Sequence, residues 1–222
     1  GFVDSMRDMV HFEFDRVMNS DFEIIFKSEV DHSAVDDIRR LPGVMVAEPV
    51  LAVVGDLSYG PRRKKLALTG VSPGAGLTRI FDSAGRQIPV PASGLLLGRH
   101  LAEDLGIGAG DRLRFVPSKG LRRPVEIPVA QIVESRVGLK AYADINFLNQ
   151  LINEAGVVSA VQVKVQQSAA EKQAFLKTLK GAPQLQSLAE AKSQKKALKQ
   201  QFDRALLGMA IVMILFAGVI FC

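Results

Sequence analysis

The feature that most constrains this chain is the apolar stretch at its end, residues 205–222. Its eighteen residues carry no charge, and only two glycines interrupt the apolar side chains. A helix of this length would extend roughly 27 Å, close to the ~30 Å hydrocarbon core of a bilayer. The alternative is a buried helix of a soluble domain, but such a helix normally keeps a polar edge. We therefore predict a transmembrane helix, cut short by the end of the chain, made of Ala205, Leu206, Leu207, Gly208, Met209, Ala210, Ile211, Val212, Met213, Ile214, Leu215, Phe216, Ala217, Gly218, Val219, Ile220, Phe221 and Cys222.

Composition indicates that residues 1–204 are folded protein. The whole chain is 48% hydrophobic and 23% charged, which is ordinary for globular domains and unlike disordered segments. The net charge of +5 comes from basic residues interspersed with acidic ones, as on a solvated surface, and does not by itself indicate nucleic acid. Cys222 is the only cysteine, so an internal disulfide and a cysteine-based metal site are excluded. The chain begins without Met and without a signal-peptide pattern, so we expect a piece of a longer protein.

The first folded unit is predicted to be a strand, a helix and a strand. Residues 22–26 are rich in branched and aromatic side chains, which is typical of a buried strand. Residues 31–40 have helical spacing, and Ser33, with an acidic residue three positions later, is expected to cap that helix. A Pro-Gly pair ends the helix, and residues 44–54 follow as an apolar strand interrupted at Pro49.

The same order of elements returns about 130 residues later. Residues 157–165 predict a strand, and Ser168 and Glu171 form a capping box in front of an apolar helical run. A Gly-Ala-Pro sequence stops this helix before a further extended stretch. Two such units favour an α+β fold with a ferredoxin-like split sheet. We expect this bracket domain to be discontinuous, formed by residues 21–59 and 141–188.

The segment between the two halves of the bracket, residues 60–140, is predicted to be an inserted β-rich lobe. Glycine, proline and serine separate its short apolar runs, which favours a small sheet or a partly closed barrel with its own modest core. One short helix, Arg99 to Leu105, is expected to end on Gly106. The predicted strands cover residues 65–70, 79–81, 94–97, 111–116 and 125–134.

Three further helices are predicted from spacings of three and four between apolar residues. They cover residues 1–20, residues 143–154, and a stalk over residues 189–204 that continues unbroken into the apolar end of the chain. Lysines on the stalk could contact anionic lipid headgroups or could simply be solvated. The first and the last of these helices would flank the folded part and connect it to a membrane.

The sequence contains no recognisable catalytic or metal-binding pattern. Its three histidines, His11, His32 and His100, lie in different predicted elements, and no phosphate-binding lysine motif is present. Residues 70–76 and 106–111 are glycine-rich, but their context is that of turns. We therefore predict no enzyme activity, no cofactor and no metal site.

Two charged clusters are interpreted as ordinary surface. The acidic residues Glu103, Asp104 and Asp111 flank a turn that they are expected to cap or solvate. The run Arg62 to Lys65 could contact an acidic partner, but one neighbouring aromatic residue, Tyr59, makes it a weak nucleic-acid site. No nucleic-acid partner is predicted.

Residues 94–115 resemble the extracytoplasmic domain of FtsX-like, or MacB-type, ABC-transporter permeases. In that family a strand, a helix with Leu-Ala, a Leu-Gly turn and a Gly-Asp pair before a strand recur in this order, and Leu101-Ala102, Leu105-Gly106 and Gly110-Asp111 match these positions. Residues 41–49 and 68–70 are similar to neighbouring family segments. The resemblance extends over residues 20–222, and its central motif is moderately specific.

The resemblance implies a function as well as a fold. It implies a domain held in the bacterial inner (cytoplasmic) membrane, with residues 1–204 on the extracytoplasmic side, between a first membrane helix outside this sequence and a second one near Ala205. The implied partners are a cytoplasmic ABC ATPase subunit, a second permease subunit, membrane lipid, and a periplasmic adaptor or lipoprotein. ATP hydrolysis by the separate ATPase would drive extraction or export of a hydrophobic or lipid-linked substrate, as in lipoprotein export.

A second function stays open. In some family members the same domain performs mechanotransmission, regulating a partner such as a cell-wall hydrolase without transport. An exposed apolar groove between the lobe and the bracket would favour transport. A flat charged patch around Arg62 to Lys65 would favour the interaction module.

Overall fold

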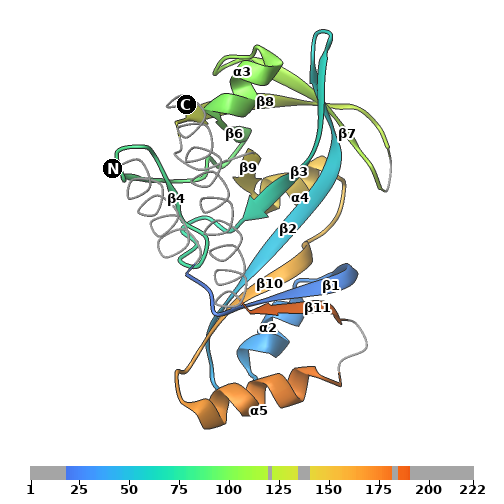
Figure 1. The fold of residues 1–222 in the computed structure, drawn as a ribbon. Helices are drawn as coiled ribbons and strands as arrows, with labels where there is room; N and C mark the ends of the chain where they lie inside the picture. The colour runs from blue at the N-terminus through green and yellow to red at the C-terminus, as the bar shows by residue number, and fades with distance from the viewer. Residues whose placement is uncertain (1–18, 120–121, 135–140, 182–184, 191–222) are drawn as a thin grey trace, which may run out of the picture.

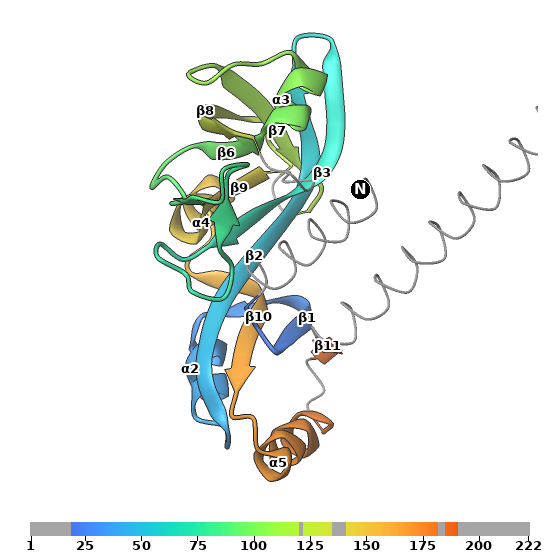
Figure 2. The same cartoon turned by 60° about the vertical axis from the view of Figure 1, so that its left-hand side comes forward.

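The computed structural model describes residues 19–119, 122–134, 141–181 and 185–190. Figures 1 and 2 show an elongated body, with β2 running along most of its length and helix α5 at one end. The predicted helix up to residue 18, residues 191–204 of the stalk and the apolar segment 205–222 lie outside the described residues. No helix in the described part has the length and apolarity needed to span a bilayer. The elements in chain order are β1 (Phe22–Asp31), α2 (Ser33–Arg39), β2 (Val44–Tyr59), β3 (Arg62–Val71), β4 (Ile80–Phe81), β5 (Gln87–Ile88), β6 (Leu95–Gly98), α3 (Arg99–Leu105), β7 (Arg112–Pro117), β8 (Val125–Val133), β9 (Ala141–Asp144), α4 (Ile145–Leu151), β10 (Val157–Val165), α5 (Ala169–Leu179) and β11 (Leu185–Glu190).

The two strand-helix-strand units are present, as β1-α2-β2 and β10-α5-β11, and they share one sheet. Their strands lie in the order β11-β1-β10-β2, with every neighbouring pair antiparallel. Each unit therefore has a strand of the other unit between its own two strands. The fold is mixed α and β with a dominant sheet and short helices, as the α+β class predicts.

Strand β2 connects this four-stranded region to the rest of the molecule. Its first half pairs with β10, its second half pairs with β3 from Val50 onward, and Gly55 to Ser58 also pair with β7. The predicted interruption at Pro49 is wrong, because the strand passes through it. Pairing with β3 begins only after Pro49, so β2 has no strand neighbour on that side at Pro49. Proline has no backbone N–H to donate, and at this position no hydrogen bond to a neighbouring strand is lost.

Six strands form a closed ring at the other end of the molecule. The pairings run β2-β3-β9-β6-β8-β7, and β7 returns to β2. The ring takes β2 and β9 from outside residues 60–140, so the inserted segment does not build it alone. Closure removes the exposed edges that an open sheet of short strands would present.

The helix predicted over residues 143–154 is shorter than expected. Ala141–Asp144 form β9 instead, which pairs with β3 and β6, and α4 begins at Ile145. The Asp144 carboxylate accepts hydrogen bonds from the backbone N–H groups of Asn146, at 2.7 Å, and Phe147, at 3.4 Å. This cap marks where the helix starts, and the apolar spacing alone did not show it.

The two capping predictions for the bracket helices have different outcomes. Ser168 caps α5 as predicted, accepting from the N–H of Glu171 at 3.3 Å while its hydroxyl donates to the Glu171 carboxylate at 2.9 Å. Ser33 does not cap α2, because it is already the first helical residue. The side chain of Asp31 accepts the Ser33 N–H instead, at 2.8 Å.

Helix α3 occupies the predicted residues and ends on Gly106, which has the left-handed φ of +69°.

The stalk prediction is wrong at its start, because Ala189 and Glu190 belong to β11. They pair with Glu23 and Phe22 of β1. The Lys172 ammonium also holds Glu190 in an ion pair at 2.8 Å.

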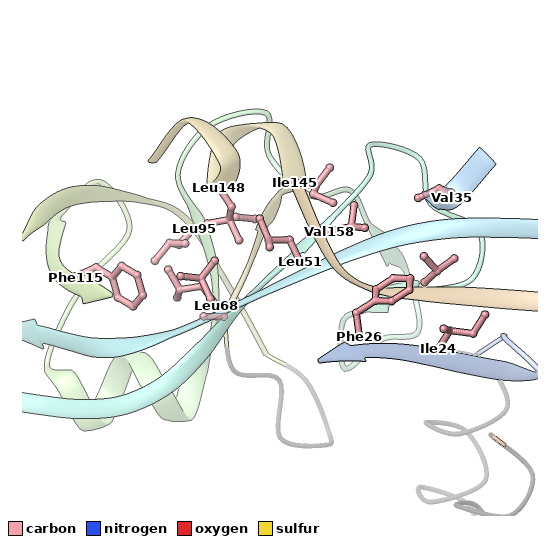
Figure 3. Close-up of a cluster of buried hydrophobic side chains, with 14 of the residues drawn as sticks. Ile24, Phe26, Val35, Leu51, Leu68, Leu95, Phe115, Ile145, Leu148 and Val158 are labelled. Carbon is pink, nitrogen blue, oxygen red and sulfur yellow. The ribbon is translucent and has the colours of Figure 1, made fainter. Parts of the chain in front are cut away.

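One hydrophobic core runs through both ends of the molecule. Phe22 and Phe175 pack their rings 5.3 Å apart in the bracket. The same cluster of buried residues continues through Leu51 and Leu68 to Phe115 inside the ring of six strands. Figure 3 shows Phe26, Leu51, Leu68 and Phe115 of this cluster, spread along β2 from one region to the other. The described part therefore has a shared core, whose continuity depends on β2.

Candidate functional site

The side chains that most often bind metal ions do not come together in the described part of the chain. Among residues that the structure describes, no three histidine, cysteine or acidic side chains are placed to hold a metal ion. His32 and His100 are both exposed and belong to different ends of the molecule, while His11 and Cys222 lie outside the described residues. The features left to describe are the glycine-rich segments, the basic run and the grooves of the described part.

Both glycine-rich segments contain the predicted turns, although the first begins inside strand β3, which ends at Val71. In the first, Gly70 is buried in β3, and the N–H of Gly76 donates to the Glu48 carboxylate at 2.8 Å. In the second, the Asp111 carboxylate accepts the N–H of Gly108 at 2.9 Å and closes the turn after α3. Neither segment presents a row of free N–H groups to a phosphate.

The basic run from Arg62 to Lys65 is divided between the two faces of β3. The Arg62 guanidinium donates to the backbone oxygens of Glu103, at 3.1 Å, and Asp104, at 3.4 Å. Lys64 forms an ion pair with the Asp104 carboxylate at 3.0 Å. Arg63 and Lys65 alternate with these residues and therefore lie on the other face of the strand. The flat patch of four basic residues that would favour an interaction module is not formed.

A groove of about 790 Å³ lies where the bracket meets the ring of six strands. This volume is within the range of small-molecule binding sites, roughly 300–1,000 Å³. Its walls come from β1, β2, β3 and β8, from the end of β7 and the connection that follows it, from the end of α4 and the segment after it, and from the start of β10. We call it the bracket groove. The residues lining it are Glu29, Ala52, Val53, Val54, Lys65, Pro117, Ser118, Lys119, Arg123, Val125, Leu151, Ile152, Asn153, Glu154 and Val157.

The bracket groove is lined by both apolar and charged side chains. Val54 is 47% exposed in it, one of the few large apolar side chains that the described part leaves open to solvent. Its cationic lining residues come from β3 and the β7–β8 connection, and its two acids come from β1 and the segment after α4. An apolar ligand with a polar end would match this arrangement.

The side chain of Asn149 fixes the wall that α4 contributes. It is buried, with 6% of its surface exposed. Its amide nitrogen donates to the backbone oxygens of Ile145, at 3.1 Å, and Val157, at 3.2 Å, while its oxygen accepts the Val157 N–H at 2.9 Å. It therefore ties α4 to the start of β10 across a turn in which Asn153 has φ +57°. The role of Asn149 was not predicted from the sequence. The one sign of it there is a polar amide side chain on the apolar side of a predicted helix.

One backbone hydrogen bond and two made by the Ser159 side chain hold the other wall. The N–H of Ser118 donates to the Val54 oxygen at 2.8 Å, so the β7–β8 connection is attached to β2 next to the exposed valine. The hydroxyl of Ser159 accepts the Ala52 N–H at 2.8 Å and donates to the Val50 oxygen at 3.3 Å, where β10 and β2 cease to pair. The bracket groove is thus bounded by hydrogen-bonded backbone on both sides.

Comparison with solved structures identifies the fold. The periplasmic region of MacB from Actinobacillus actinomycetemcomitans aligns with a TM-score of 0.52 and 14% identity, covering 86% of this chain and 97% of that one. The extracellular domain of the noncanonic ABC-type transporter YknZ from Gram-positive bacteria aligns with a TM-score of 0.49 and 15% identity, over 71% and 88% of the two chains. No protein-family model and no curated protein matches the chain. The MacB-type resemblance of residues 94–115 is therefore confirmed at the level of the fold.

Proposed function

We propose that the bracket groove binds a hydrophobic or lipid-linked substrate. The observation that carries this proposal is an apolar groove of about 790 Å³ with Val54 exposed at 47% in it. Burying apolar surface in such a groove stabilises a complex by about 25 cal/mol for each Å² removed from water. The charged lining residues would orient a ligand that carries a polar group.

We also propose that this chain is the extracytoplasmic part of an ABC-transporter permease in the bacterial inner membrane. Two observations support this: the fold is that of a MacB periplasmic region, and residues 94–115 resemble the permease family. In this proposal the apolar segment 205–222 crosses the membrane, and residues 1–204 lie outside the cytoplasm. The domain itself catalyses no reaction and holds no cofactor.

The proposed partners follow from that assignment. A separate cytoplasmic ATPase supplies the energy, and a second permease subunit completes a dimer. Membrane lipid surrounds the apolar segment, and a periplasmic adaptor or lipoprotein contacts the outer domain. We propose further that the strand order β11-β1-β10-β2 is a ferredoxin-like split sheet, with residues 21–59 and 141–188 as the bracket and 60–140 as its insertion.

Mechanical transmission to a partner protein is the second candidate function. The observation in its favour is the continuity of β2, whose sixteen residues pair with both regions, and of the core that surrounds it. A body held together in this way would transmit a displacement from one end to the other. In this alternative the domain regulates a partner such as a cell-wall hydrolase and transports nothing.

Co-purification tests the permease assignment. The full-length protein is extracted from its native membrane in a mild detergent, and associated proteins and lipids are identified by mass spectrometry. We expect an ABC ATPase in near-stoichiometric amount. Purification without any ATPase would show that the transporter-complex proposal is wrong. An ATPase accompanied by a cell-wall hydrolase, with no bound lipid or hydrophobic compound, would favour the mechanical function.

A further inference from the structure

A second, smaller pocket of about 310 Å³ lies at the tip of the β2–β3 hairpin. It shares no lining residue with the bracket groove. Four of the residues that line it are arginines and one is an acid. We call it the arginine pocket, and its polar residues include Ser58, Arg62, Arg63, Arg112, Arg114 and Glu126.

The strand pairing explains how these residues come together. Ser58 of β2 lies directly opposite Arg63 of β3 and also opposite Arg114 of β7, and Arg114 lies opposite Glu126 of β8. Directly opposite residues point to the same face of a sheet, so the four residues form one row across four strands. Neighbouring strands are about 4.8 Å apart, which leaves Arg63 and Arg114 about 10 Å apart with only a serine between them. A small group can therefore fit over Ser58 and reach both guanidinium groups.

The charges in this row are not neutralised within the described part of the chain. Arg62 is engaged by the carbonyl end of α3, and the Arg112 guanidinium donates to the Glu126 backbone oxygen at 3.2 Å. The guanidinium groups of Arg63 and Arg114 have no hydrogen-bond or ion-pair partner among the described residues. Three cationic side chains besides Arg62 thus face one hollow, opposed by the single carboxylate of Glu126.

From this geometry we infer that the arginine pocket binds a phosphate group. Guanidinium donors are planar and match phosphate oxygens in pairs of hydrogen bonds. Inorganic phosphate is largely a dianion near neutral pH and can compensate two arginines at once. A lipid phosphodiester carries one negative charge, but its two non-bridging oxygens can each accept from one guanidinium group. The phosphate can belong to a lipid headgroup or be free in solution, and both sources offer at least two non-bridging oxygens that Arg63 and Arg114 can share.

The test uses the whole chain in an uncharged detergent at constant ionic strength. Inorganic phosphate and the water-soluble dihexanoyl phosphatidylglycerol are titrated separately by calorimetry. Tyr59 lines the arginine pocket, and because the protein contains no tryptophan, tyrosine fluorescence supplies a second readout. We expect saturable binding of at least one probe, weakened about tenfold or more by Arg63→Gln and by Arg114→Gln.

Two further variants distinguish specific binding in the arginine pocket from non-specific electrostatic attraction to a basic protein. Lys177→Gln removes one exposed positive charge from α5 and should leave the affinity unchanged. Glu126→Gln removes the acid opposite Arg114 and should tighten binding. Thermal unfolding of each variant shows whether it keeps its fold.

The outcomes decide both the proposal and the source of the phosphate. Tighter binding of the phosphatidylglycerol assigns the site to a lipid headgroup, and equal or tighter binding of inorganic phosphate assigns it to a free phosphate. The inference is wrong if neither probe binds, or if the two arginine variants bind as the parent does. Binding of polyglutamate without binding of either phosphate probe would also overturn it, in favour of an acidic polypeptide. None of these results depends on the bracket groove, so the proposed function stands or falls separately.

Discussion

The ring of Phe115 on β7 packs directly against the backbone of Gly55 on β2. A β-carbon at position 55 would lie 2.5 Å from two atoms of that ring and 2.5 Å from the backbone oxygen of Val116. Real β-carbons do not approach other atoms so closely, so β7 can pair with β2 here only because residue 55 has no side chain. That pairing closes the ring of six strands.

Gly55→Ala should therefore destabilise the protein. Overpacking of a close contact typically costs about 1–3 kcal/mol, and urea unfolding should show a loss of free energy in this range. Gly181→Ala is the matched control, because nothing lies within 4 Å of its added carbon, and it should stay within about 0.5 kcal/mol of the parent. Phe115→Leu should recover part of the loss when combined with Gly55→Ala, and additive losses would contradict the contact.

Asn149→Ala should weaken both stability and the bracket groove. The variant leaves the N–H and the carbonyl of Val157 without their side-chain partner, at a cost of about 1–3 kcal/mol in the free energy of unfolding. Asn146→Ala changes an exposed asparagine of the same helix and should have little effect. Equal losses for the two variants would show that Asn149 does not hold the wall formed by α4.

Ser168→Ala should shorten or fray helix α5. The hydroxyl caps the N–H of Glu171, and losing such a cap costs about 1 kcal/mol. Ser168→Asp keeps an acceptor at the same place and should restore most of the stability. Helical content by circular dichroism and the unfolding midpoint measure both changes, and an unchanged midpoint in the alanine variant would refute the capping role.

Glu23 should make stability depend on pH. Burial raises the pKa of this carboxyl on β1 above its ordinary value, because the charged form is poorly solvated there. The folded state then holds a proton that the unfolded state has already released. The protein's free energy of unfolding therefore falls as the pH rises from the ordinary carboxyl pKa of the unfolded chain through the raised pKa of the folded state.

Glu23→Gln should remove that fall and make the protein more stable near neutral pH than the parent. Glu29→Gln, which changes an exposed acid on the same strand, is the control. Urea unfolding at a series of pH values from 4 upward measures the slope. A variant whose stability falls with pH as steeply as the parent's would show that Glu23 is not the cause.

Local sequence signals were enough to predict the ends of helices that a single residue begins or terminates. Gly106 ends α3 because it takes a left-handed conformation, and Ser168 starts α5 because its side chain caps the helix. The short strand β9 was missed because Ala141 to Asp144 have little strand character of their own. They become a strand only by pairing with β3 and β6, which lie far away in the sequence.

The binding surfaces could not be predicted in the same way. The bracket groove combines Val54 with Glu29 and Leu151, which come from three elements separated by many residues. The arginine pocket depends on the register that places Arg63 and Arg114 on either side of Ser58. Neither arrangement leaves a local pattern, because each arises only when distant strands pair.

The most direct test of the central claim compares two exposed valines of β2. Val54 lies in the bracket groove and is 47% exposed, while Val46 lies outside it and is 39% exposed. A photoreactive benzophenone amino acid is placed at either position in the full-length protein, cells are irradiated, and the adducts are identified by mass spectrometry. We expect a lipid or lipid-linked molecule attached at position 54 and little or none at position 46. Equal labelling at both positions, or no hydrophobic adduct at position 54, would contradict the proposal that the bracket groove holds the substrate.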